Sequence, residues 1–234
     1  MFYFDPMYMI FMIPGVILML WAQSRVKGSY QKYSKIPNDE RMTGAQVARR
    51  ILDSNGLQGV PITQSPGELS DHYDPRSRSL HLSPGVYGQP SIAAMGIAAH
   101  EVGHALQHAQ AYAPLKVRTA IVPAVSIGSN LGIFILMAGV MFSNQTMAWW
   151  GVGLFALTTV FALVTLPVEF DASRRAMEQL QRLGIADGGV GGGPELAGVK
   201  SVLTAAAWTY VASFASSLLT LLYYISMVNR SSND

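Results

Sequence analysis

The sequence predicts a mainly α-helical integral membrane protein, with about four transmembrane helices and a small α+β section. Two observations carry this prediction. Only 13% of the 234 residues are charged and 50% are hydrophobic, whereas soluble domains usually carry about 25% charged residues. The uncharged residues are also gathered in long runs, and one crossing of a bilayer needs about 20 mostly apolar residues.

Three of these runs account for the four helices. The first and last are each long enough for one crossing. The middle run, from Thr119 to Val168, is too long for one helix and suits two helices joined by a tight turn at Ser143-Asn144-Gln145. The expected spans are about 6–24, 119–142, 147–168 and 202–228.

The basic residues predict the orientation of these spans. All but Arg230 of the 16 Lys and Arg residues fall on one side of the four-span arrangement, and positive residues stay on the cytoplasmic side of a membrane. We therefore expect a protein of the cell membrane, in contact with lipid, whose N- and C-termini lie outside. The polar sections, about 25–118 plus 169–200, would form a cytoplasmic catalytic section within one domain, 1–234.

Composition also excludes some classes of partner and site. The net charge of +2 is too small to indicate a nucleic-acid partner, and the chain has no cysteine, which excludes disulfides and Cys-ligated metals. Within the polar section, 42–55 has the pattern of an amphipathic helix, and 59–63 and 79–83 are short strand candidates. A helix is expected from Gln89-Pro90-Ser91 to about Gln110, and the Gly-rich stretch 185–194 reads as a mobile loop.

The most informative motif is His100-Glu101-Val102-Gly103-His104, which has the form H-E-x-x-H. Positions i and i+4 lie on one face of a helix, so His100 and His104 can point their imidazoles at one metal ion. Zinc binds neutral imidazole well. Glu101 lies close enough to act on a zinc-bound water as a general base. The motif therefore predicts a hydrolytic zinc site.

A third ligand is expected from the end of the membrane hairpin. A two-helix hairpin returns the chain to the membrane face that it left, so Glu169 emerges on the same face as the two histidines. With no cysteine and no well-placed third histidine, a carboxylate is the expected ligand. Glu169 is the best-placed carboxylate and Asp171 is the alternative. His108 lies two turns from His100 along the same helix, about 12 Å away, and is too far to share the ion.

The chain resembles the YugP-like family of membrane zinc metallopeptidases over nearly its whole length. The resemblance is carried by the N-terminal span and four motifs: Asp71-His72-Tyr73-Asp74-Pro75, Leu80-His81-Leu82-Ser83, Ala99-His100-Glu101-Val102-Gly103-His104-Ala105 and Leu166-Pro167-Val168-Glu169-Phe170-Asp171-Ala172-Ser173. It implies a gluzincin-like, zincin-like fold for the cytoplasmic section. It also implies Zn²⁺ held by His100, His104 and Glu169, with Glu101 as the base. More distant gluzincins place an Asp where this chain has Ser173.

Other polar residues are expected around the ligands without a unique assignment. The candidates for supporting the ligands through hydrogen bonds are Asp171, Ser173, Arg175 and His108. The reaction also needs a group that stabilises the oxyanion, and the sequence leaves open His72, His81, Tyr73, Arg175 and Tyr210.

The resulting expectation is a zinc metalloendopeptidase that hydrolyses polypeptide substrates, membrane-associated or unfolded, at the cytoplasmic face. The alternative is a zinc-stabilised membrane scaffold or binding protein without catalysis. Glu101 separates the two readings, because a structural zinc site has four protein ligands and needs no base. A transporter is disfavoured because the expected spans carry almost no ionisable residues.

Overall fold

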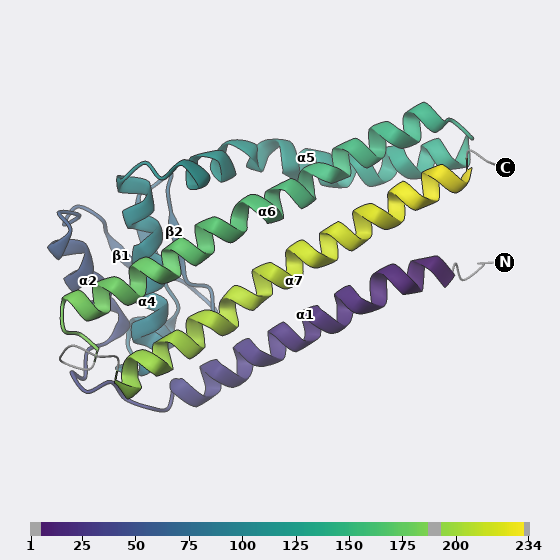
Figure 1. The fold of residues 1–234 in the computed structure, drawn as a ribbon. Helices are drawn as coiled ribbons and strands as arrows, with labels where there is room; N and C mark the ends of the chain where they lie inside the picture. Colours follow the sequence, from purple (N-terminus) through teal and green to yellow (C-terminus); the bar gives the residue numbers. More distant parts are fainter. Residues whose placement is uncertain (1–5, 187–192, 232–234) are drawn as a thin grey trace. The chain divides into compact units, whose positions relative to one another are not determined.

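A computed structural model describes residues 6–186 and 193–231 of the chain, and most of the Gly-rich stretch expected at 185–194 lies outside these residues. The described part is mainly helical, as predicted, with one small sheet (Figure 1). Its helices and strands are α1 (Pro6–Tyr33), α2 (Gly44–Ser54), β1 (Ile62–Gln64), β2 (His72–Asp74), β3 (Ser79–Leu82), α3 (Pro84–Tyr87), α4 (Ile92–Ala109), α5 (Ala113–Met141), α6 (Gln145–Arg182) and α7 (Pro194–Ser231).

Four of the helices, α1, α5, α6 and α7, are long and apolar enough to cross a membrane. This number confirms the prediction of four. Each helix continues beyond its expected span, and α6 runs on to Arg182. The reason is that hydropathy marks where a helix can contact lipid, whereas hydrogen bonding continues the same helix into polar sequence.

The chain divides into two compact units. In its described part, the first contains residues 6–23, 116–167 and 209–231. Small residues allow close helix approach there. A Cβ added at Gly139 of α5 would clash with the backbone of Ala148 in α6. Phe134 and Ile127 leave 74% and 66% of their surface exposed, which suits a surface that faces lipid.

The second unit contains residues 24–115 and, among those described, 168–186 and 193–208. Its core is formed largely by α2 and α4, with Ile51 and Leu52 of α2 fully buried. Thr43 begins α2 with a capping box, in which Thr43 Oγ1 accepts a hydrogen bond from the Gln46 N–H and the Gln46 side chain accepts one from the Thr43 N–H. The amphipathic helix expected at 42–55 is therefore confirmed.

The small sheet has the strand order β1-β3-β2. β1 and β3 correspond to the two expected strands and pair in parallel. β2 was not expected, and it pairs antiparallel with β3 at one edge. Asp71, just before β2, accepts hydrogen bonds from the Ser83 N–H at 2.7 Å and from the Ser83 hydroxyl. These bonds tie the start of β2 to the chain beyond β3, and β2 also contacts α4.

Candidate metal centre

The central helix α4 presents the two histidines of the H-E-x-x-H motif. The helix begins where the Ser91 side chain accepts a hydrogen bond from the Ala94 N–H, which satisfies one of the free amides of the first turn. This start and the end near Gln110 agree with the prediction. His100 and His104 lie one turn apart, and their ring centroids are 4.9 Å from each other. Both imidazoles are 12% exposed.

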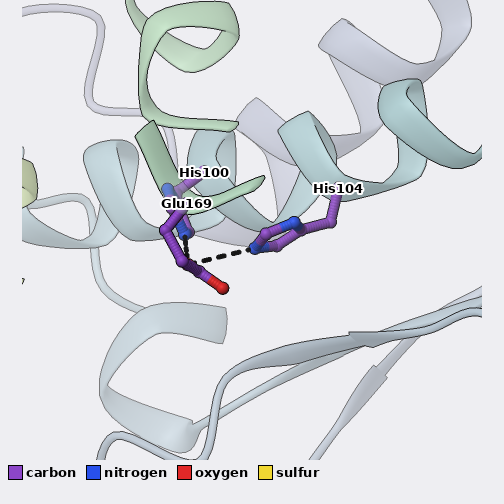
Figure 2. Close-up of side chains that lie close together, drawn as sticks. All are labelled: His100, His104 and Glu169. Atoms are coloured by element: carbon purple, nitrogen blue, oxygen red, sulfur yellow. Dashed lines mark hydrogen bonds and ion pairs between the residues drawn. The ribbon is translucent and has the colours of Figure 1, made fainter. Parts of the chain in front are cut away.

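Glu169 reaches these histidines from α6, because α4 and α6 come very close together. Gly103 lies between the two histidines in sequence, and a Cβ added there would be 2.5 Å from the carbonyl oxygen of Ala172. The absence of a side chain at Gly103 thus lets the first polar turn of α6 lie against α4. Glu169 is 2% exposed and its carboxylate faces both imidazoles (Figure 2).

The three side chains can hold one metal ion. One possible ligand atom from each of His100, His104 and Glu169 lies within 4.8 Å of the other two. Glu169 Oε2 is 3.3 Å from His100 Nε2 and 3.5 Å from His104 Nε2. Two ligand atoms bound tetrahedrally to zinc at about 2.0–2.1 Å are about 3.4 Å apart. Two imidazoles and a carboxylate at this spacing therefore fit zinc.

The electrostatic environment of this group favours a cation. Burial lowers the pKa of the His104 imidazole, but the hydrogen bond and negative charge of Glu169 outweigh burial, with further contributions from Glu101 and Gln107. The pKa of His104 is consequently above its usual value. A site whose negative charge retains a proton on His104 also attracts a metal cation.

Glu101 lies beside this group without belonging to it. Its side chain is 9% exposed, and its Oε2 accepts a hydrogen bond from the Tyr73 N–H of β2 at 3.1 Å. One carboxylate oxygen is therefore held by the edge strand. The carboxylate is fixed next to the histidines and outside the three-residue group that can hold a metal ion.

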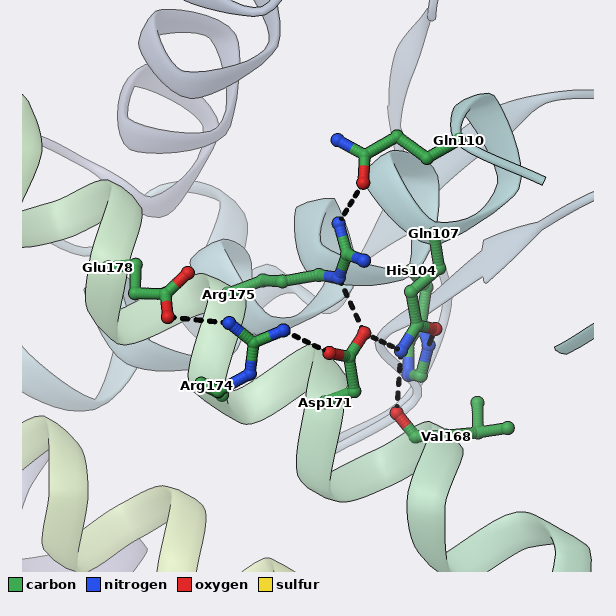
Figure 3. A network of polar contacts seen from close by, with 8 residues as sticks. All are labelled: His104, Gln107, Gln110, Val168, Asp171, Arg174, Arg175 and Glu178. Atoms are coloured by element: carbon green, nitrogen blue, oxygen red, sulfur yellow. Dashed lines mark hydrogen bonds and ion pairs between the residues drawn. The ribbon is translucent and has the colours of Figure 1, made fainter. Parts of the chain in front are cut away.

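Each histidine also bonds through its other nitrogen. His104 Nδ1 is 3.0 Å from the side-chain oxygen of Gln107, and Gln107 donates to the Val168 carbonyl at 2.7 Å and to Asp171 Oδ2 at 3.0 Å (Figure 3). His100 Nδ1 is 3.1 Å from the Ser173 hydroxyl. The interaction of Ser173 with His100 is among those that the sequence suggested. Gln107 was missed, although its position three residues after His104 on the same helix was an available signal.

Asp171 lies in a separate ionic network. Its carboxylate accepts hydrogen bonds from Arg174 and Arg175, in addition to the bond from Gln107. Arg175 also donates to the Gln110 side chain and stacks over the Tyr112 ring. Glu169 rather than Asp171 thus lies with the two histidines. Gln107 connects Asp171, and through it Arg175, to His104.

The remaining residues from the sequence analysis lie in three places. His108 Nδ1 is 2.9 Å from the Tyr73 hydroxyl, and neither side chain belongs to the metal-binding group. His72 and His81 stack on each other across β2 and β3, and both nitrogens of His81 have hydroxyl partners in Thr63 and Ser79. Tyr210 belongs to the first compact unit. Of the five oxyanion candidates, Tyr73 is the one with a described hydrogen bond to Glu101.

Comparison with known proteins gives a consistent result. Residues 8–229 match the family described as "Putative neutral zinc metallopeptidase". The chain is 42% identical over 213 residues to the "Putative membrane protease YugP" of Bacillus subtilis (strain 168). The aligned region covers 91% of this chain and 92% of that protein. No solved structure matches the chain significantly.

Proposed function

The chain belongs to the neutral zinc metallopeptidase family, and from this premise we propose that it is a membrane-embedded metalloendopeptidase of the H-E-x-x-H type. The observation that carries the proposal is the convergence of His100, His104 and Glu169 from two helices, with the separate carboxylate of Glu101 beside them. Three protein ligands leave a zinc coordination position for water or substrate, as in catalytic zinc sites.

In this proposal His100, His104 and Glu169 would hold a zinc ion. When bound, zinc polarises the peptide carbonyl and lowers the pKa of water. Glu101 accepts the proton of the attacking water and then delivers it to the leaving amine. The hydrogen bond from the Tyr73 N–H holds Oε2 of Glu101, which leaves Oε1 to exchange the proton.

We further propose that the site faces the cytoplasm and that the substrates are membrane-associated or unfolded polypeptides. The distribution of basic residues supports this side of the membrane. The ligand Glu169 directly follows the span expected at 147–168. A site this close to the membrane face suits chains that are tethered there or emerge there without stable structure.

The proposal is tested by measuring bound zinc and cleavage of unfolded casein with the purified full-length protein in detergent. Wild type, Glu101→Gln and Glu169→Ala are compared side by side. Wild type is expected to hold one zinc ion and to cleave. Glu101→Gln should hold zinc and lose cleavage, because the amide cannot accept the proton. Glu169→Ala should lose both zinc and cleavage.

The same measurements would reveal a zinc-stabilised scaffold. In that case wild type would bind zinc tightly and cleave neither casein nor a diverse peptide mixture. Glu101→Gln would also leave every cellular phenotype of the protein unchanged. Retention of cleavage by Glu101→Gln would contradict the assignment of Glu101 as the base.

A further inference from the structure

A cavity of about 420 Å³ lies beside the candidate metal centre, within the same compact unit. Ala105 and His108, in the last part of α4 after the H-E-x-x-H motif, form one wall. The loop after α2 forms another wall with Leu57 and Val60, and the β2–β3 hairpin contributes Tyr73 and Arg78. The walls are thus mainly apolar, with polar groups contributed by the hairpin and His108.

Tyr73 connects this cavity to the proposed reaction centre. Its N–H donates to Glu101 Oε2 at 3.1 Å, while its hydroxyl is 2.9 Å from His108 Nδ1 and its side chain lines the cavity. His108 itself follows His104 by one helical turn, about 6 Å along the axis. When a peptide bond lies beside Glu101, a neighbouring side chain of that peptide can therefore reach the cavity.

The cavity walls are held in place by the protein itself. Arg49 of α2 donates to the Val60 carbonyl at 2.8 Å and to the Leu57 carbonyl at 3.0 Å. In the β2–β3 hairpin, Asp74 accepts hydrogen bonds from the N–H groups of Arg76 and Ser77 and closes the turn. The cavity is therefore preformed, which reduces the entropy cost of binding a side chain.

Arg78 gives the cavity its charge. The guanidinium has no hydrogen-bond or ion-pair partner among the described residues, and the cavity lining contains no carboxylate within that part of the chain. Burial raises the pKa of the Tyr73 phenol, and the positive charge of Arg78 opposes this rise. The charge of Arg78 is therefore felt at the Tyr73 side chain, which lines the cavity. Arg78 also adopts a left-handed backbone conformation, φ 52°, which is uncommon for a residue other than glycine.

We propose that this cavity is a substrate subsite that selects an acidic side chain, foremost glutamate, close to the cleaved bond. The apolar walls would contact the methylene groups of the glutamate and Arg78 would bind its carboxylate. This proposal rests on the proposed peptidase function. An exposed arginine with no partner in the described part of the chain, next to a preformed apolar cavity, provides the charge complementarity that a glutamate side chain requires.

The test uses zinc-loaded full-length protein and internally quenched decapeptides that differ at a single position, occupied by Glu, Gln or Lys. This position is moved from two residues before the cleaved bond to two residues after it. When the variable residue is at one of these peptide positions, wild type is expected to cleave the Glu peptide with a kcat/KM about tenfold above that of the Gln peptide. Arg78→Gln should bring this ratio close to one, and Arg78→Glu should favour Lys.

Two variants serve as controls for charge and space. Arg76→Gln removes a positive charge from the same turn without altering the cavity lining, and it should retain the preference for Glu. Ala109→Leu adds bulk at an exposed position that lines the cavity. It should lower kcat/KM for the Glu peptide more than for a peptide with Ala at that position.

A binding measurement separates failure of the subsite from failure of the peptidase. Fluorescence anisotropy of labelled Glu and Gln peptides with zinc-loaded Glu101→Gln protein measures how tightly each peptide binds, without turnover. Tighter binding of the Glu peptide, lost in the double variant with Arg78→Gln, supports the subsite even if no peptide is cleaved. Cleavage with no preference for Glu at any position, or a preference that survives Arg78→Gln, would overturn the subsite and leave the peptidase proposal intact.

Discussion

The side-chain oxygen of Gln107 lies 3.0 Å from Nδ1 of His104, and this contact selects the tautomer that the imidazole adopts in its neutral, metal-binding form. The amide nitrogen of Gln107 already donates to the Val168 carbonyl and to Asp171. The oxygen of Gln107 must therefore accept, so Nδ1 of His104 carries the hydrogen. His104 Nε2 is then left with its lone pair directed at the Glu169 side of the site, as a metal ligand requires.

Replacement of Gln107 is consequently expected to weaken zinc binding. Gln107 is fully buried, and Gln107→Ala removes the acceptor that orients His104 and selects its tautomer. Loss of such a supporting hydrogen bond typically costs about 10- to 100-fold in metal affinity. The zinc Kd is measured by competition with a chromogenic chelator.

A matched control for this variant is Gln110→Ala, three residues further along the chain. Gln110 is exposed and bonds to Arg175 rather than to a histidine. Its zinc Kd should remain within about twofold of wild type, because the contacts of His104 are unchanged. Equal zinc affinities for Gln107→Ala and Gln110→Ala would contradict the role of Gln107.

The hydroxyl of Ser173 has a smaller expected effect on His100. It lies 3.1 Å from His100 Nδ1, but a neutral hydroxyl that can rotate restrains the ring less than a buried amide held at three points. Ser173→Ala should weaken zinc binding less than tenfold and less than Gln107→Ala does. The chelator assay compares the two variants directly, and a larger loss for Ser173→Ala would reverse this ranking.

Gly103 is expected to be intolerant of even one methyl group. A Cβ there would lie 2.5 Å from the Ala172 carbonyl oxygen, so Gly103→Ala must push α6 away from α4 and Glu169 away from the histidines. Overpacking of this kind costs about 1–3 kcal/mol. We expect the zinc Kd to rise by tenfold or more, as measured by chelator competition.

Gly28→Ala provides the control for this substitution. Gly28 lies in α1 within the same unit, and a Cβ added there meets nothing within 4 Å. Alanine is favoured over glycine inside a helix by about 0.5–1 kcal/mol. Gly28→Ala should retain wild-type zinc affinity, and a normal Kd for Gly103→Ala would show that α4 and α6 can separate without cost to the site.

The sequence predicted well those features that follow from local periodicity or from the path of the chain. His100 and His104 share a helix face by their spacing alone, and three long uncharged runs, the middle one divided by a turn, correctly marked the four helices that are long and apolar enough to span a membrane. Glu169 was expected beside the histidines because a membrane hairpin returns to its starting face, and the carboxylate does lie there.

Features that depend on tertiary contacts were harder to predict. β2 has three residues and is followed by Pro75, so its strand conformation comes from pairing with β3 rather than from its own propensity. Gln107 becomes a partner of His104 only because the Val168 carbonyl and Asp171 of α6 fix its amide. The spacing of the sequence gives no signal for the pairing of β2. For Gln107 it gives only the i,i+3 position relative to His104, and not the contacts with α6 that fix its amide.

Removal of the metal should destabilise the protein through mass action. A ligand that binds only the folded state at 100 times its Kd contributes about 2.7 kcal/mol to stability. Wild type and Glu101→Gln should therefore both lose thermal stability when EDTA is added, and both should regain it with excess zinc. Glu169→Ala, which lacks a ligand, should respond to neither addition. A response equal to that of wild type would place the metal elsewhere.

The orientation of the polar sections can be measured with single cysteines, because the chain has none of its own. Gln58 lies in the polar section 25–118 and Gln145 begins α6 after the hairpin turn, and both are exposed. If the polar section is cytoplasmic, a membrane-impermeant maleimide added to intact cells should label Gln145→Cys and spare Gln58→Cys. Permeabilised cells should label both variants equally, which controls for differences in thiol reactivity. Labelling of Gln58→Cys in intact cells would place the metal centre on the outer face and would exclude cytoplasmic substrates.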